Sequence, residues 1–129
     1  MAGKPKILIV DDEAPVALIM SLLLARAGCE AEVATTRAEA INRVLISQFD
    51  LITLDVTMPD CSGFDLCAEI KQNPRLRHIP VVFVSGRCLL EDQQQGLDAG
   101  AADYITKPFR ADLVPRLLSH VRRRHMASN

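Results

Sequence analysis

The regular alternation of two hydrophobic patterns constrains the fold of this chain more than any other feature of its sequence. Continuous apolar runs are typical of strands buried on both faces of a sheet, whereas apolar residues three and four positions apart are typical of a helix with one buried face. The two patterns alternate along the whole chain. The predicted strands span residues 6–10, 30–34, 49–55, 79–84 and 102–106, and a predicted helix follows each of them.

This alternation predicts an α/β fold with an open, doubly wound, five-stranded parallel sheet. Right-handed crossovers would place helices on both faces of the sheet. In sheets of this kind, ligands bind outside the carboxyl ends of the strands. Residues that directly follow the strands are therefore the first candidates for a functional site.

Local signals set the expected limits of the first three helices. Pro15 stands where the first helix can begin, and Gly28 can end it. Thr36 and Glu39 form a capping box, in which each side chain accepts a hydrogen bond from the backbone N–H of the other residue. The third helix must finish before Pro74.

The last two predicted helices are less regular. The segment from Leu89 to Gly100 is expected to be a weak helix, because Gly96 lies inside it and its glutamines add little apolar surface. The final helix is expected to extend to Val121. Pro115 falls early in it, and we expect the missing N–H to remove a hydrogen bond and to bend the start of the helix.

Length and composition favour one globular domain. Of the 129 residues, 49% are hydrophobic and 24% are charged, and the net charge of −1 gives no electrostatic reason to expect nucleic acid or a membrane surface as a partner. The sequence lacks both an apolar run of about 18 residues and a secretory signal, so we expect a cytoplasmic protein. Free thiols are expected at the four cysteines, which lack the paired spacing of zinc ligands: Cys29, Cys61, Cys67 and Cys88.

Polar residues stand at the carboxyl ends of four of the five predicted strands: Asp11 and Asp12 at the first, Asp55 at the third, Ser85 at the fourth and Lys107 at the fifth. Crowded carboxylates repel one another, so such a site attracts a proton or a cation. Their oxygens suit Mg²⁺, for which Mn²⁺ could substitute. Asp55 is then equipped as a nucleophile towards phosphorus, since the metal, Lys107 and the Ser85 hydroxyl would stabilise the oxygens of an aspartyl phosphate.

Four motifs at the expected strand ends carry a family resemblance: Val10–Glu13, Leu54–Pro59, Val84–Gly86 and Asp98–Phe109. In this order they resemble the receiver domains of two-component response regulators, from about Lys6 to Val121. The resemblance implies a flavodoxin-like fold with strand order 2-1-3-4-5, an order for which a member of this family is itself a standard example. We expect a receiver domain over residues 6–122, an N-terminal extension over 1–5, and a linker or expression remnant over 123–129.

The resemblance also implies which residues carry the chemistry. Asp55 would accept a phosphoryl group from a phosphohistidine on a sensor histidine kinase or a histidine phosphotransfer protein. Asp12 and Asp55 would bind Mg²⁺ directly, and Asp11 directly or through water. The backbone carbonyl of Thr57 would complete the protein ligands.

The remaining implied residues would respond to the phosphoryl group. Lys107 would pair with the phosphoryl oxygens, Ser85 would move to hydrogen-bond them, and Tyr104 would change rotamer with Ser85. The peptide bond between Lys107 and Pro108 would be cis. We expect this switch to change the face formed by residues 89–121, which would bind an output domain, a partner protein or a second copy of the chain.

Other functions remain open as alternatives. A degenerate receiver or a flavodoxin-like module would act by binding only, but the loop after the first strand is acidic and lacks the glycine of a phosphate-binding loop. An aspartyl-nucleophile phosphatase usually has a second acid two residues after its nucleophile, where this chain has Thr57. We expect no enzymatic activity beyond the domain's own phosphoryl transfer and autodephosphorylation. The sequence leaves open whether the domain stands alone or belongs to a longer protein.

Overall fold

The predicted strands form a single parallel sheet with the order β2-β1-β3-β4-β5, as shown by a computed structural model that describes residues 3–121. The predicted tail over residues 123–129, and the first two residues of the predicted N-terminal extension, lie outside the described residues. The strand order and the alternation with helices confirm the predicted flavodoxin-like fold class. The elements in chain order are β1 Lys6–Val10, α1 Ala14–Arg26, β2 Glu30–Ala34, α2 Arg37–Ile46, β3 Leu51–Leu54, α3 Gly63–Gln72, β4 Val81–Ser85, α4 Leu90–Asp98, β5 Asp103–Thr106 and α5 Leu113–Leu118.

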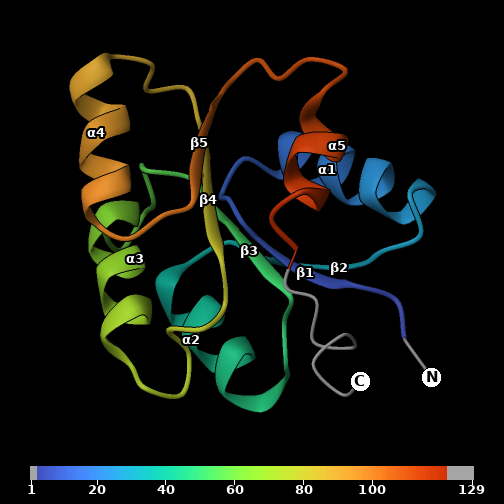
Figure 1. Ribbon diagram of the computed structural model, residues 1–129, viewed down its shortest axis with the longest axis horizontal. Helices are drawn as coiled ribbons and strands as arrows, with labels where there is room; N and C mark the ends of the chain where they lie inside the picture. The colour runs from blue at the N-terminus through green and yellow to red at the C-terminus, as the bar shows by residue number, and fades with distance from the viewer. Residues whose placement is uncertain (1–2, 122–129) are drawn as a thin grey trace.

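Helices cover both faces of the sheet (Figure 1). α1 and α5 lie against one face, and α2, α3 and α4 lie against the other. Two apolar clusters fill the spaces between the layers: one includes Ile9 and Leu117 on the α1–α5 side, and the other includes Leu54 and Leu66 on the α2–α4 side. All the residues of β3 and β4 are buried, as continuous apolar runs predict for strands covered on both faces.

The parallel register brings four strand ends together. Val10 pairs with Leu54 at the ends of β1 and β3, and Ser85 pairs with Thr106 at the ends of β4 and β5. The residues that follow these positions therefore meet at one edge of the sheet. This is the edge where the sequence predicts a functional site.

The start of α2 differs in one respect from the predicted capping box. Thr36 Oγ1 accepts a hydrogen bond from the backbone N–H of Glu39 at 3.1 Å, as predicted. The Glu39 carboxylate accepts from the N–H of Thr35, at 2.8 Å, instead of the N–H of Thr36. Thr35 also donates its hydroxyl to the same oxygen at 3.2 Å, so it offers two donors where Thr36 would offer one.

The last helix is shorter than predicted, and its proline costs it no hydrogen bond. α5 ends at Leu118, and Val121 lies beyond it, half-buried against the α1–α5 side. Asp112 is the N-cap, so Pro115 is the third helical residue. Backbone N–H groups in the first turn have no partner within a helix. The predicted loss of a hydrogen bond at Pro115 is therefore wrong.

Two further properties bear on the sequence-based expectations. Within residues 3–121, no helix combines the length and the apolar character needed to cross a bilayer. The four cysteines are free thiols, as predicted.

Candidate functional site

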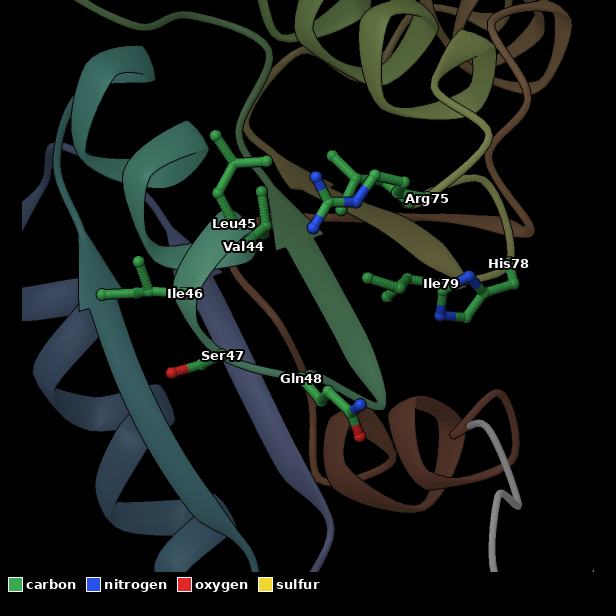
Figure 2. Close-up of a pocket in the computed structure, with 9 residues that line it drawn as sticks. Val44, Leu45, Ile46, Ser47, Gln48, Arg75, His78 and Ile79 are labelled. Atoms are coloured by element: carbon green, nitrogen blue, oxygen red, sulfur yellow. The ribbon is translucent and has the colours of Figure 1, made fainter.

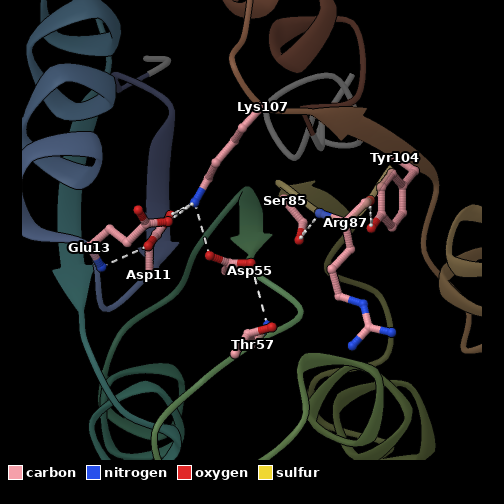
Figure 3. Close-up of polar contacts among 8 residues, drawn as sticks. All are labelled: Asp11, Glu13, Asp55, Thr57, Ser85, Arg87, Tyr104 and Lys107. Carbon is pink, nitrogen blue, oxygen red and sulfur yellow. Dashed lines mark hydrogen bonds and ion pairs between the residues drawn. The ribbon is translucent and has the colours of Figure 1, made fainter. Parts of the chain in front are cut away.

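Lys107 is the centre of the polar cluster at the carboxyl edge of the sheet (Figure 3). Its Nζ lies 2.8 Å from Asp11 Oδ2, 2.7 Å from Glu13 Oε1 and 2.9 Å from Asp55 Oδ2. The lysine directly follows β5, and its peptide bond with Pro108 is cis, as predicted. One cation thus joins carboxylates from the ends of β1 and β3 to the end of β5.

The electrostatics of Lys107 follow from these contacts. Burial by itself would lower the pKa of the ammonium group, but the hydrogen bonds with Asp11, Glu13 and Asp55 outweigh it and raise the pKa above its ordinary value. Lys107 therefore stays charged over the whole physiological range. Removing this residue would leave Asp11 and Asp55 buried without their cation.

Asp11 is a buried carboxylate that is held in place on both oxygens. It is 2% exposed, its Oδ1 accepts the backbone N–H of Glu13 at 2.9 Å, and its Oδ2 faces Lys107. Burial raises the pKa of Asp11, and the hydrogen bond from Lys107 offsets part of that rise. A carboxyl whose charge is disfavoured by burial gains from a further cation at the site.

Three carboxylates are grouped closely enough to share a metal ion. Oxygens of Asp11, Asp12 and Asp55 all lie within 4.8 Å of one another. Asp12 is exposed, whereas the other two are buried, so the group opens to solvent on one side. This arrangement could hold a divalent cation with several waters in the remaining positions.

The loop between β3 and α3 folds tightly around Asp55. Asp55 is 5% exposed, and its Oδ1 accepts the N–H of Thr57 at 3.4 Å. Thr57 pairs with Ser62 in an isolated antiparallel bridge, which closes the loop. A Cβ on Gly63 would lie 2.1 Å from the backbone carbonyl oxygen of Asp55, so only glycine allows α3 to start this close to the backbone of Asp55.

Ser85 and Tyr104 meet at the loop that follows β4 (Figure 3). Ser85 is buried, and its Oγ accepts the backbone N–H of Arg87 at 3.3 Å. The Tyr104 hydroxyl, on β5, donates to the carbonyl oxygen of the same arginine. Burial raises the pKa of Tyr104, so its hydroxyl keeps the proton that it donates.

The structure brings the sequence-predicted residues to one edge, and it adds three contact partners that are not among the predicted site residues: Glu13, Arg87 and Asp92. Glu13 pairs with Lys107, and Arg87 pairs with Asp92 of α4 through Nη2 at 3.0 Å. Glu13 directly follows the predicted aspartate pair, so its position was a usable signal. Arg87 lies in a loop and Asp92 in the following helix, five residues further on. Neither a helix nor a strand brings residues at that spacing together, so the sequence gives no signal for this pair.

Two hollows lie on different parts of the surface. A hollow of about 570 Å³ is lined by the end of α2 and the segment before β4, including Ile46, Arg75 and His78 (Figure 2). It is at the amino ends of the strands and so lies away from the carboxylates. Another, of about 380 Å³, is lined in part by Thr57 and Arg87 and adjoins the polar cluster.

Comparison with known proteins identifies the family. The family model described as the response regulator receiver domain matches residues 7–119. The chain belongs to this family. Receiver domains are signalling domains of two-component systems, and the match covers almost all of the described residues of this one.

Individual relatives agree with this assignment. The receiver is 36% identical over 124 residues to the two-component response regulator ORR12 of Oryza sativa subsp. japonica. The alignment covers 92% of this chain and 99% of that protein. It is 39% identical over 124 residues to the phosphate regulon transcriptional regulatory protein PhoB of Pseudomonas aeruginosa, covering 95% of this chain and 54% of that protein. The chain thus spans about half the length of the second relative.

Solved structures show the same architecture. The chemotaxis response regulator CheY4 of Vibrio cholerae superposes with a TM-score of 0.83 at 28% identity, covering 90% of this chain and 97% of that one. A CheY-like receiver domain protein from Methanospirillum hungatei has a TM-score of 0.83 at 29% identity, covering 91% and 93%. The flavodoxin-like fold of this receiver is therefore that of known family members.

Proposed function

We propose that this receiver domain accepts a phosphoryl group on Asp55 and uses it as a signalling switch. The position of the Asp55 carboxylate carries the proposal: it is buried, its Oδ2 lies 2.9 Å from Lys107 Nζ, and it is grouped with Asp11 and Asp12. A phosphoryl group bound there would find a fixed cation beside its oxygens. Fixed charges of this kind stabilise a transferred phosphoryl group without reorganisation during the reaction.

The proposed reaction is one phosphoryl transfer. An oxygen of Asp55 attacks the phosphorus of a phosphohistidine on a sensor histidine kinase or a phosphotransfer protein. The new O–P bond forms as the N–P bond breaks, and the histidine nitrogen keeps the electron pair and takes up a proton. Lys107 then exchanges a carboxylate partner for a phosphoryl oxygen, and water later hydrolyses the acyl phosphate. The domain would act on itself and not as an enzyme on external phosphate esters.

Mg²⁺, or Mn²⁺ in its place, would be held by Asp11, Asp12, Asp55 and the backbone carbonyl of Thr57. The grouping of the carboxylate oxygens within 4.8 Å supports this assignment, because hard cations prefer such oxygen donors. The bound ion would supply positive charge to the phosphoryl oxygens. Removal of the metal should therefore prevent phosphorylation while leaving the protein folded, since Lys107 already pairs with two of the carboxylates.

The proposed output surface is the face formed by residues 89–121, which includes α4, β5 and α5. A phosphoryl group adds about −1.5 to −2 charges. Ser85 would move towards it, and Tyr104 would change rotamer with Ser85. Leu90 and Leu97 of α4 are 83% and 44% exposed, so this face presents apolar side chains to a protein partner. That partner would be an output domain, a separate protein or a second copy of the chain, in the cytoplasm.

Intact mass spectrometry tests this function. The wild type and Asp55→Asn would each be incubated with acetyl phosphate, with and without Mg²⁺. We expect one phosphoryl group on the wild type, none on Asp55→Asn, and none without the metal. Lys107→Met should be phosphorylated much more slowly, because it removes the cation beside Asp55.

Three outcomes would contradict the proposal. No mass gain in a folded wild type would indicate a degenerate receiver that acts by binding alone. A phosphoryl group that persists in Asp55→Asn would mean that another residue accepts it. Repeated turnover of phosphate esters would instead indicate an aspartyl-nucleophile phosphatase.

A further inference from the structure

Arg87 contacts both predicted switch residues through its backbone. Its N–H donates to Ser85 Oγ at 3.3 Å, and its carbonyl accepts the Tyr104 hydroxyl. Figure 3 shows the Arg87 backbone between these two side chains, with the guanidinium extending away from Asp55. A movement of either Ser85 or Tyr104 therefore alters a hydrogen bond to the backbone of this residue.

The side chain of Arg87 reaches a different element, α4. Its Nε and Nη2 lie 3.2 Å and 3.0 Å from Oδ1 of Asp92. The Asp92 side chain is 6% exposed, whereas that of Arg87 is 55% exposed. A buried carboxylate that loses its partner is costly, so the first turn of α4 depends on this arginine.

α4 has few other contacts that would fix its first turn. Its N-cap, Leu89, makes no side-chain capping hydrogen bond, and its buried residues are Asp92 and Gly96, neither of which is a large apolar residue. The Gln93 side chain adds one bond, from Nε2 to the carbonyl of Cys88 at 3.2 Å. The pair between Arg87 and Asp92 is therefore the main charged contact, among the described residues, between α4 and the loop that follows Ser85.

We propose that Arg87 is a positioning residue that couples the phosphorylation site to α4 through its ion pair with Asp92. The inference rests on the proposed function of Asp55. In the free protein the pair holds α4 and the loop after β4 together. When Ser85 moves towards a phosphoryl group, Arg87 moves with it, the pair breaks, and α4 is released.

This coupling makes a reciprocal prediction. If the phosphorylated state lacks the pair, then removing the pair beforehand lowers the free energy of switching and favours ligands that mimic the phosphoryl group. In Arg87→Met we expect amide exchange in α4 of the free protein to rise, and beryllofluoride with Mg²⁺ to bind more tightly, each by roughly five- to tenfold. Asp92→Asn should change both quantities in the same direction.

The experiment measures hydrogen exchange by mass spectrometry over residues 86–99, with and without beryllofluoride and Mg²⁺, and the affinity for beryllofluoride by titration. Tyr104 is the one tyrosine of the chain, which has no tryptophan, so intrinsic fluorescence reports on Tyr104 directly. Arg87→Lys, which keeps a cation, should restore most of the wild-type behaviour. Gln94→Ala is the matched control. Gln94 is an exposed α4 residue whose side chain donates a hydrogen bond to Asp98 of the same helix, so its loss leaves the contact between α4 and the loop after β4 unchanged.

The outcomes separate this inference from the function on which it rests. Wild-type exchange and affinity in Arg87→Met would overturn the coupling while leaving phosphorylation of Asp55 intact. A variant that is merely less stable, with unchanged beryllofluoride affinity, would also overturn it, since the pair would then have only a structural role. A folded wild type without any response to beryllofluoride would overturn the proposed function and this inference together. Should Asp92→Asn fail to fold, Arg87→Met still gives the answer, because its side chain is exposed.

Discussion

α3 and α4 are neighbours on the same face of the sheet, but they are anchored in different ways (Figure 1). α3 begins with a capped end: Ser62 Oγ accepts the N–H of Phe64 at 3.2 Å. Half of its ten residues are buried against the sheet, namely Gly63, Phe64, Leu66, Cys67 and Ile70. Apolar burial therefore holds this helix directly behind Asp55.

α4 has the opposite character. Leu89 provides no side-chain cap, and the buried residues of the helix are a carboxylate, Asp92, and a glycine, Gly96. A Cβ on that glycine would lie 3.0 Å from ring atoms of both Phe83 and Tyr104. The glycine thus allows close packing on the aromatic rings, in addition to lowering helix propensity.

The difference indicates how a receiver can respond without unfolding. Elements that bury little apolar surface open at lower free energy than those in the core. The helix next to Asp55, the proposed phosphoacceptor, is held by burial. The helix next to Ser85 and Tyr104, the proposed switch residues, is held by polar contacts that can exchange partners. The following predictions test that contrast, beginning with the largest expected effect.

Ile70→Ala should reduce the free energy of unfolding by about 2–5 kcal/mol, because it removes a fully buried side chain and leaves a cavity. Leu97→Ala on α4, at a residue that is 44% exposed, should cost less than about 1 kcal/mol. Urea denaturation of both variants measures the two losses. Equal losses would show that the helices are anchored alike.

Gly96→Ala should destabilise the protein by up to about 2 kcal/mol, since crowding against Phe83 and Tyr104 outweighs the gain of about 1 kcal/mol in helix propensity. Tyrosine fluorescence should change as well, because Tyr104 must move. A net gain in stability would show that a methyl group fits between α4 and the rings of Phe83 and Tyr104. Gln94→Ala serves as the control for helix propensity at an exposed α4 position.

Asp103→Asn should cost about 1–2 kcal/mol at neutral pH, because Asp103 joins β5 to α5. Arg116 donates to both oxygens of Asp103 at 2.7 Å, and His120 Nε2 lies 3.0 Å from one of them. Mainly through the hydrogen bonds from Arg116, the pKa of Asp103 is lowered to about 2.

The pH dependence of that variant has a definite sign. A carboxyl whose folded-state pKa is lowered stabilises the protein above its ordinary pKa, near 3.8, and the stabilisation is lost as the pH falls towards the folded-state value. The difference between the wild type and Asp103→Asn should therefore shrink as the pH falls from about 4 to about 2. Urea titrations at several pH values measure it. A difference that grows on acidification would mean that another group is responsible.

Leu89→Ser should stabilise α4 by about 0.5–1 kcal/mol, because it supplies the missing N-cap at a residue that already has extended backbone angles. We expect slower amide exchange in α4 and a smaller response to beryllofluoride. Ser62→Ala makes the reverse change in α3 and should cost about 1 kcal/mol. If amide exchange in α4 stayed unchanged in Leu89→Ser, fraying of its first turn would not explain the proposed response of this helix to phosphorylation.

Much of the fold was predictable because its signals are local. The continuous apolar runs defined the buried strands, and parallel strands necessarily bring their carboxyl ends to one edge. Asp11, Asp55, Ser85 and Lys107 could therefore be assigned to a common site before any contact between them was known. The sequence thus assigns these four residues to one edge of the sheet, whereas their roles remain proposals.

The side-chain contacts required the tertiary structure. Glu13 and Lys107 pair across 94 positions in the chain, and no periodicity within a single helix or strand predicts such a contact. The pairing of Arg87 with Asp92 depends on how α4 lies against the loop after β4. Likewise, the effect of Pro115 depended on where the helix begins. The proline lies in the first turn, where backbone N–H groups have no partner within the helix.

By itself, then, the sequence determined which segments are buried and which polar residues stand at their ends, because the spacing of apolar residues indicates burial. The sequence also indicated that α4 has little apolar surface, but the tertiary structure alone distinguished a helix anchored by apolar packing, α3, from one joined to its neighbouring loop by an ion pair, α4. That distinction depends on the faces that α3 and α4 turn towards the sheet and on the distances between charged groups. Spacing along the chain specifies neither, since both are set by packing among residues that are far apart in sequence.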